Sequence, residues 1–176
     1  AELGRLTGMH AVFGKAMDYS GGGYGEAILS RFPLEQIKVH ALPAPENCEP
    51  RCALAATVQL GDDGPKVVFV GTHLEHADRS VRLCQAGKLS PILAEDNRLP
   101  AILVGDFNAT PGSPPINVLL AHWSFAAKDE PQPTFPSEEP RIKLDYVFYR
   151  PATSWKVVDV KVIDEKVASD HCPLLV

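Results

Sequence analysis

The stretch AILVGDFNATPGSPPI, residues 101–116, decides the fold of this chain. AILVGDF predicts a strand, and the polar GDFN lies at its end. Ser113 is a good N-cap, and the prolines after it are tolerated in a first helical turn, so SPPINVLLA predicts a short helix. A strand that ends in polar residues before a helix is well placed to aim side chains into a cleft.

The chain before this stretch predicts several strands and one longer helix. IKVHAL, CALAATVQL and KVVFVGTHL are strand candidates, and GDDGP between the last two favours a hairpin. From Asp78 to Asp96 the pattern is helical, and Pro91 should kink the helix or begin a second segment. Its expected apolar contacts are Val81, Cys84, Leu89, Ile92 and Leu93.

The two ends of the chain complete the pattern. Ala1–Leu6 resembles a helix closed by Gly8, MHAVFG predicts a strand, and the glycines of SGGGYGE indicate a tight or flexible connection into AILS. After a Pro-rich surface loop from Lys128 to Pro140, strands are expected at LDYVFY, WKVVDVKVI and CPLLV. Many short strands with interspersed helices favour an α/β sandwich of two packed sheets, with residues 1–176 as one domain.

Composition excludes some classes of protein. A net charge of -5 argues against a chain that grips long nucleic acid with its whole surface, although a local basic groove stays open. The sequence has no apolar run of about 18 residues and no signal pattern at its N-terminus, and the compartment stays unassigned. Cys48, Cys52, Cys84 and Cys172 match no zinc pattern; Cys48 and Cys52 are compatible with a small disulfide or with free thiols.

Three polar clusters follow or precede apolar strands: THLEH, GDFN and SDH. Asp106, Asn108 and Asp170 offer the oxygen ligands that Mg²⁺ or Mn²⁺ prefers. His171 is a proton acceptor near neutral pH, and Asp145, inside the apolar run LDYVFY, needs a partner and is suited to orient it. Together these residues predict metal-assisted hydrolysis.

Each cluster also has a plainer interpretation. GDFN alone is often a turn whose side chains bond their own backbone, and SDH alone often caps an element. His73 alone is more often structural than catalytic, and GGGYG lacks the lysine of a phosphate-binding loop. The order in which the clusters occur distinguishes these interpretations.

That order, GYGEAILSRFPL, VGTHLEH, VGDFNATPGSPPI, RIKLDYVFYR and ASDHCPLLV, resembles the endonuclease/exonuclease/phosphatase family, which includes deoxyribonuclease I. The resemblance implies a four-layer α/β/β/α sandwich and phosphoester cleavage with Mg²⁺ or Mn²⁺. By motif position, Asp106 would orient the attacking water, Asn108 would stabilise the transition state, and Asp170 would hold the metal. His171 would act as general base or phosphate contact, with Asp145 orienting it. His73 would contact the scissile phosphate or assist the leaving group.

Other positions of the resemblance imply structural roles or a departure. Arg82 and Gln85 match a helix that follows the THL motif and are interpreted as supporting residues, and Glu49 with Arg51 as an ion pair. Family members open with a strand that carries an Asn and a strand that carries a metal-binding Glu, and this chain begins after both. We therefore expect a partial domain without its first strands, and exposed sheet edges that favour self-association.

Three functions remain open at this point. The first is a metal-dependent hydrolase of phosphoesters in nucleic acid, a nucleotide, or a phospholipid or inositol phosphate head group. The second is a catalytically incompetent fragment or binding remnant of the same fold. The third is a thiol enzyme with Cys172 as nucleophile. Neighbouring residues in a strand point to opposite faces, which argues against this function for Cys172 beside His171. The loops GGGYG and Pro131–Pro140 are the candidates for substrate selection.

Overall fold

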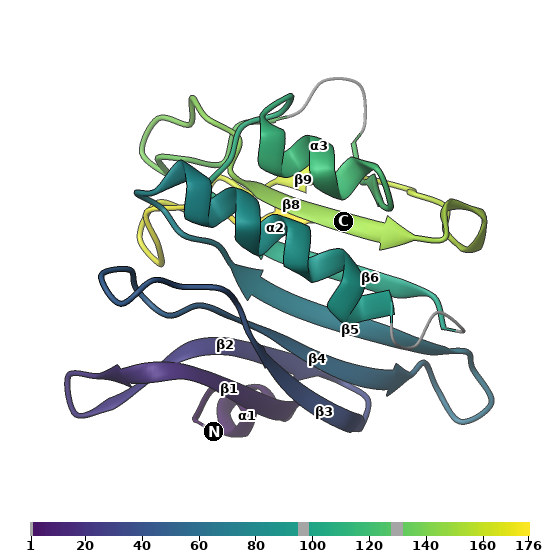
Figure 1. The fold of residues 1–176 in the computed structure, drawn as a ribbon. Helices are drawn as coiled ribbons and strands as arrows, with labels where there is room; N and C mark the ends of the chain where they lie inside the picture. Colours follow the sequence, from purple (N-terminus) through teal and green to yellow (C-terminus); the bar gives the residue numbers. More distant parts are fainter. Residues whose placement is uncertain (1, 95–98, 128–131) are drawn as a thin grey trace.

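The centre of the protein is a six-stranded mixed sheet with the order β3-β4-β5-β6-β8-β7 (Figure 1). The computed structural model describes residues 2–94, 99–127 and 132–176. β5 and β6 run parallel and the other neighbours are antiparallel. The strands are Leu34–Ala41 (β3), Cys52–Gln59 (β4), Lys66–His73 (β5), Ala101–Asp106 (β6), Ser124–Phe125 (β7) and Asp145–Arg150 (β8).

The sheet is covered on both faces, which confirms the predicted α/β sandwich. Along β4, Ala53 and Ala55 join the core under the helices, whereas Leu54 and Ala56 pack with Ile28 on the opposite face. This alternation is the period of two that a strand imposes on its side chains. CALAATVQ, which is buried at every position before Gln59, is therefore covered from both sides.

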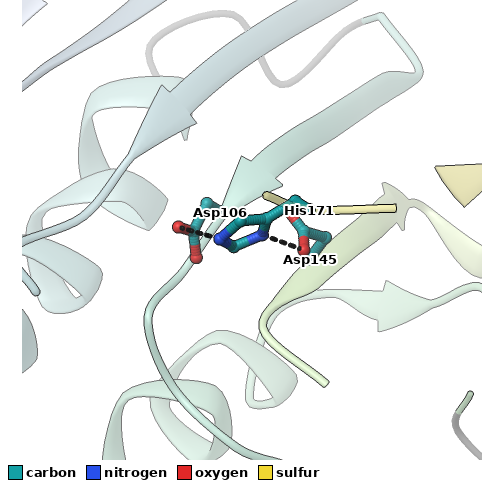
Figure 2. A group of neighbouring side chains, drawn as sticks. All are labelled: Asp106, Asp145 and His171. Carbon is teal, nitrogen blue, oxygen red and sulfur yellow. Dashed lines mark hydrogen bonds and ion pairs between the residues drawn. The ribbon is translucent and has the colours of Figure 1, made fainter. Parts of the chain in front are cut away.

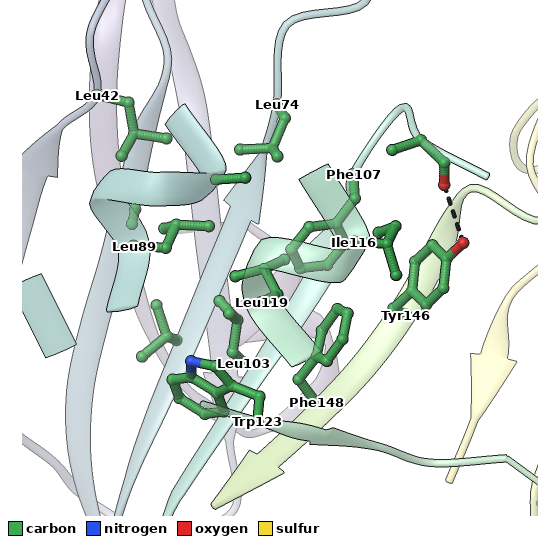
Figure 3. Close-up of a cluster of buried hydrophobic side chains, with 14 of the residues drawn as sticks. Leu42, Leu74, Leu89, Leu103, Phe107, Ile116, Leu119, Trp123, Tyr146 and Phe148 are labelled. Atoms are coloured by element: carbon green, nitrogen blue, oxygen red, sulfur yellow. Dashed lines mark hydrogen bonds between the residues drawn. The ribbon is translucent and has the colours of Figure 1, made fainter. Parts of the chain in front are cut away.

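Helices α2 (Arg79–Ala94) and α3 (Pro114–Leu120) cover one face and enclose the main core. Figure 3 shows this core, in which the rings of Phe107 and Phe148 lie 5.0 Å apart, centroid to centroid, in an edge-to-face arrangement. The polar groups of two aromatic side chains in this core are hydrogen-bonded. The Trp123 indole N–H donates to the Ser90 hydroxyl, and the Tyr146 hydroxyl donates to the Ala109 carbonyl at 2.9 Å. That last bond ties the GDFN loop to β8.

The opposite face carries a hairpin of β1 (His10–Tyr19) and β2 (Gly22–Ser30), with α1 (Glu2–Thr7) beside β1. Ser20 and Gly21 both have positive φ, as a two-residue hairpin turn of this hand requires. The turn is thus confined to Ser20–Gly21, and the following glycines belong to β2 rather than to the expected loop. The helix predicted before Gly8 is confirmed, with Gly8 at φ 68°.

LDYVFY forms β8 as predicted, but the strands expected at WKVVDVKVI and CPLLV were largely wrong. Only Lys161–Val162 (β9) and Leu174–Leu175 (β10) pair, after a short 3-10 helix at Ala152–Ser154. β-branched residues favour strands, but a strand also needs a neighbouring strand that takes its backbone hydrogen bonds, and residues 155–160 belong to none of the ladders among the described residues. Residues 155–159 instead line an apolar hollow of about 760 Å³ over β5, β6 and β8.

Several smaller expectations also change. α2 runs as one helix through Pro91, and Cys84 on it is exposed while Gln85 is buried; the side chains of Ile92 and Leu93 lie outside the described residues. In the segment expected as a surface loop, Lys128 to Pro140, residues 128–131 lie outside the described residues. Farther along this segment, Thr134 and Ser137 are buried. All four cysteines are free thiols. Among the described residues no helix is long and apolar enough to cross a membrane.

Candidate functional site

Three of the predicted site residues lie in one row at the ends of three neighbouring strands. In the parallel pair β5 and β6, His73 is the register partner of Asp106. In the antiparallel pair β6 and β8, Asp106 is the partner of Asp145. Adjacent strands lie about 4.8 Å apart, so the register alone brings these side chains together.

The fourth residue, His171, completes a compact group with two of them. Its Nδ1 lies 2.8 Å from Asp145 Oδ2, and its Nε2 lies 3.8 Å from Asp106 Oδ2 (Figure 2). One ligand atom from each of Asp106, Asp145 and His171 lies within 4.8 Å of the others. A carboxylate accepts from N–H, so Nδ1 carries the proton shared with Asp145 and Nε2 faces Asp106.

Buried residues of the segment that the sequence predicted as a Pro-rich surface loop hold His171 in place. Thr134 donates its backbone N–H to Ile142, and its Oγ1 accepts from the backbone of Asp145. The backbone N–H of Cys172 donates to the Thr134 carbonyl at 2.8 Å, and that of Ser137 donates to the Asp170 carbonyl at 2.7 Å. The loop therefore fastens the SDH segment to the end of β8.

The turn after β6 aims Asp106 and Asn108. Gly105 has φ 147°, and a Cβ there would overlap the Thr72 carbonyl of β5, so only glycine fits. Asn108, at φ 47°, donates its backbone N–H to Asp106 Oδ1 at 2.7 Å. The turn that GDFN alone suggests is thus present, and it serves to orient the Asp106 carboxylate.

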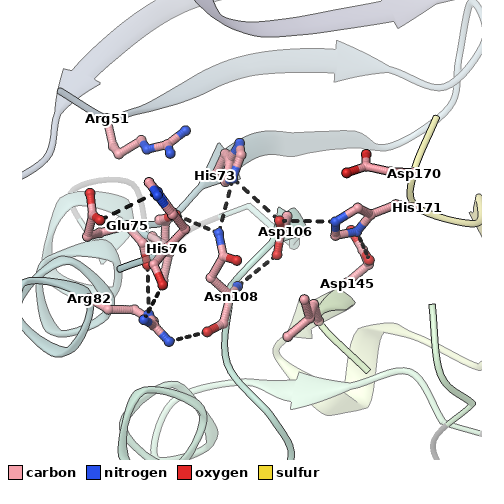
Figure 4. Close-up of polar contacts among 12 residues, drawn as sticks. Arg51, His73, Glu75, His76, Arg82, Asp106, Asn108, Asp145, Asp170 and His171 are labelled. Atoms are coloured by element: carbon pink, nitrogen blue, oxygen red, sulfur yellow. Dashed lines mark hydrogen bonds and ion pairs between the residues drawn. The ribbon is translucent and has the colours of Figure 1, made fainter. Parts of the chain in front are cut away.

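All six predicted residues line one pocket of about 620 Å³ (Figure 4). Around Asp106 this pocket gathers His73, Nε2 of which lies 3.4 Å from Asp106 Oδ2, and Asn108. Asp170 lies at the rim with an exposed side chain and is not part of the compact group of three. The pocket-lining residues are Arg51, His73, His76, Asp106, Asn108, Phe135, Leu144, Asp145, Ser169, Asp170 and His171.

The two histidines differ in electrostatic environment. Burial alone would lower the pKa of His171, but the hydrogen bond and charge of Asp145, with the charges of Asp106 and Asp170, raise it. Burial, and then the charge of Arg51, lower the pKa of His73 to about 4. His73 is therefore neutral at physiological pH, whereas His171 holds its proton more tightly than a free imidazole.

The supporting role predicted for the helix after THL agrees with the contacts. Arg82 donates to the carbonyls of Glu75 and His76, at 2.7 and 2.8 Å, and to the carbonyl of Asn108. Gln85 accepts from the backbone of Glu75 and donates to Pro43. Arg82 thus joins the loop after β5 to the loop after β6.

Sequence reasoning missed several contacts in and around this pocket. The predicted ion pair of Glu49 and Arg51 is present at 3.0 Å, but Arg51 also donates to the Tyr24 hydroxyl, which contacts His73. The ring of Phe135 lies 4.8 Å from that of His171. Half-buried Glu26 has a pKa raised to about 7, chiefly by burial. Both Tyr24 and Glu26 stand in the GYGE motif, which was the available signal.

The donor set suits a hard divalent cation. Burial, and then the charge of Asp145, raise the pKa of Asp106, against the hydrogen bond from Asn108 that lowers it. Carboxylates crowded together in this way are stabilised by a cation with oxygen preference. The residues present therefore fit a hard divalent cation, with Asp106 as the central donor.

Cys172 does not share this pocket. Its side chain is 3% exposed, and its thiol donates to the Ser137 carbonyl. A buried thiol held by a backbone carbonyl is a structural cysteine rather than a nucleophile.

Comparisons with known proteins give several relatives and many similar structures. YbhP, an uncharacterized protein of Escherichia coli strain K12, is 25% identical over 168 residues, which cover 92% of this chain and 65% of YbhP. The chain thus spans less than two thirds of that relative's length.

Two solved structures show the same fold. A mannosyl-6-phosphatase of Bacteroides thetaiotaomicron superposes with a TM-score of 0.77 at 19% identity, covering 98% of this chain and 78% of its own. The beta toxin of Staphylococcus aureus, in a mutant with bound magnesium ions, superposes with a TM-score of 0.67 at 18% identity. The match covers 84% of this chain and 66% of the toxin chain. The Endonuclease/Exonuclease/phosphatase family profile matches residues 3–171. Because that match covers nearly the whole sequence, the chain belongs to the Endonuclease/Exonuclease/phosphatase family.

Proposed function

We propose that this protein is a divalent-metal-dependent phosphoester hydrolase. The observation that carries the proposal is the convergence of His73, Asp106, Asn108, Asp145 and His171 on one pocket at the ends of β5, β6 and β8. Hydrolysis of a phosphoester needs a proton acceptor for water, donors for the charged oxygens, and a site of positive charge. The pocket offers groups for each task.

The side chains divide these tasks by their chemistry. Asp145 fixes the Nδ1 proton of His171, so Nε2 faces the pocket and accepts a proton from water when His171 is neutral or donates to a phosphate oxygen when it is charged. Asp106 orients the water, and the Asn108 amide stabilises charge on the phosphate. His73 contacts the phosphate or assists the leaving group.

A divalent cation completes the site in this proposal. Asp106, the Asn108 side-chain oxygen and Asp170 would hold it, and the magnesium bound in the fold-related beta toxin supports this choice of metal. Such an ion supplies Lewis-acid stabilisation of negative charge on the phosphate.

The charge distribution favours compact phosphoesters over long nucleic acid. The net charge is -5, and among the described residues that line the pocket Arg51 is the one Lys or Arg. Counterion release, which drives binding to long nucleic acid, needs many such charges. We propose a nucleotide, sugar phosphate or lipid head group as substrate; the name of the mannosyl-6-phosphatase is consistent with this class. The apolar hollow over β5, β6 and β8 further supports self-association.

Turnover of two artificial substrates tests the function. The 176-residue chain is assayed with bis-p-nitrophenyl phosphate and p-nitrophenyl phosphate, with Mg²⁺ or Mn²⁺ and with chelator. We expect metal-dependent turnover that Asp106→Ala lowers by at least about a hundredfold. Asp18→Ala, at an exposed carboxylate of the β1–β2 hairpin, is the matched control and should retain activity. Full activity of Asp106→Ala, or activity in chelator, would overturn the proposal.

A binding remnant of the same fold is the alternative. Calorimetry distinguishes the two: absence of Mg²⁺ and Mn²⁺ binding at millimolar metal, together with absent turnover, would favour the remnant. Metal binding that Asp106→Ala removes would favour the enzyme.

A further inference from the structure

Lys143 is a buried lysine two residues before Asp145. It is 6% exposed and is not among the described residues that line the pocket, so it does not touch a substrate bound there. Its ammonium donates to the Asp145 carbonyl at 2.9 Å and lies 4.7 Å from the centroid of the Tyr146 ring. Burying an ammonium costs free energy that a methionine of similar length would avoid. Packing alone therefore does not explain a lysine at this position.

The backbone of Asp145 faces away from β6. Leu144 accepts from the backbone N–H of Phe107, on the β6 side, at 2.9 Å. Successive residues of a strand point their N–H and C=O groups to opposite sides, so those of Asp145 point to the other side of β8. On that side, the last backbone bond to β8 among the described residues runs from Ala126 to Val147, two residues short of Asp145.

Two buried side chains bind the Asp145 backbone there. Thr134 Oγ1 accepts from the Asp145 N–H at 3.3 Å, and Lys143 Nζ donates to the Asp145 carbonyl at 2.9 Å. These are the bonds that a neighbouring strand would make in the interior of a sheet. The carboxylate on this backbone lies 2.8 Å from Nδ1 of His171.

We propose that Lys143 is a positioning residue that, with Thr134, holds the Asp145 backbone so that its carboxylate points at His171. The ammonium fixes the peptide that follows Asp145, and the Thr134 hydroxyl fixes the peptide that precedes it. A side chain on a backbone fixed at both peptides keeps one direction, which preserves the bond to His171. Only the effect on turnover rests on the proposed function, because the geometry of Asp145 and His171 is a property of the chain.

Proton NMR of the imidazole N–H tests this geometry without turnover. The Nδ1–H of His171, bonded to Asp145, should give a downfield signal that exchanges slowly with water and is absent from His171→Gln. We expect the signal in the parent protein and in Lys143→Arg, which keeps a donor, and its loss in Lys143→Met. The urea midpoint of Lys143→Met should change little, because removal of a buried charge offsets the lost bond.

Thr134 provides a matched pair of variants. Thr134→Ser keeps the hydroxyl acceptor and should keep the signal, whereas the isosteric Thr134→Val should lose it. Lys38→Met, at an exposed lysine of β3, is the control for the loss of a lysine and should keep the signal. A signal that survives in folded Lys143→Met, or that Thr134→Ser loses as Thr134→Val does, would overturn the proposal whether or not the chain turns over substrate.

Kinetics provide the second readout. Lys143→Met should lower kcat by about tenfold or more with little change in KM, because a misplaced catalytic group impairs the reaction rather than substrate binding. Lys143→Arg should retain more activity than Lys143→Met, and Lys38→Met should match the parent protein. An active parent with unchanged kcat in Lys143→Met would contradict the positioning role. An inactive parent with the expected NMR signals would count against the proposed function alone.

Discussion

Among single residues, Glu26 stands out because the proposed chemistry does not use its half-buried carboxyl. Burial raises its pKa to about 7, Arg51 lowers it in part, and Asp106 raises it again. The folded-state pKa thus lies above the unfolded value of 4.5. The stabilising contribution is complete below pH 4.5 and is lost as the pH rises through about 7.

Glu26→Gln should remove this loss, because glutamine resembles the protonated carboxyl. We expect the parent protein to lose up to about 3 kcal/mol relative to Glu26→Gln between pH 4.5 and pH 8. Urea unfolding at both pH values measures the difference. Glu46→Gln, at an exposed glutamate, should track the parent; a Glu26→Gln profile parallel to that of the parent would refute the burial argument.

At the scale of elements, α2 positions the site as much as the strands do. Arg82 on α2 donates to the carbonyls of Glu75, His76 and Asn108, which belong to the loops after β5 and β6. Hydrogen bonds from a charged donor contribute about 1.5–3 kcal/mol each at most, and their loss frees two loops at once. Activity is sensitive to the resulting misplacement of His73 and Asn108.

Arg82→Met should therefore lower kcat by about tenfold or more and the free energy of unfolding by about 1–3 kcal/mol. Steady-state kinetics and urea unfolding on the same preparation measure both. Arg79→Met, at an exposed arginine one turn earlier on α2, should change neither. A loss of stability without a loss of kcat would show that the loops keep their geometry without Arg82.

The sequence predicted the elements that carry their own signals. Alternating or continuous apolar runs marked β4, β5, β6 and β8, and polar residues at their ends marked His73, Asp106 and Asp145. The contacts of Tyr24 with Arg51 and His73 depend on how a hairpin packs over the sheet, and periodicity does not report that packing. The burial of Thr134 and Ser137 escaped prediction because a Pro-rich composition marks irregular structure, whether exposed or buried.

The strand predictions near the C-terminus were wrong for a related reason. WKVVDVKVI has the composition of a strand, but pairing requires a neighbour, and among the described residues only Lys161–Val162 find one. Composition reports the preference of a segment, whereas the number of available partners is a property of the whole sheet.

For the whole molecule, the outer face of the sheet is covered unevenly. The β1–β2 hairpin packs with β4, whereas Phe69, Ile102 and Val147 line the apolar hollow of about 760 Å³ over β5, β6 and β8. On its outer wall Val158 is 81% exposed and Leu175 is 55% exposed. Contiguous exposed apolar surface is a feature that favours association between chains.

We therefore expect the apparent mass to rise with protein concentration in sedimentation velocity experiments. Val158→Glu places a charge on the wall of the hollow, where desolvation on association would be costly, and should keep the protein monomeric over the same concentration range. Val167→Glu is the matched control, because Val167 is 94% exposed and lies outside the hollow, and it should associate like the parent. A parent protein that stays monomeric, or equal association of both variants, would mean that this face is stable in water without a partner chain.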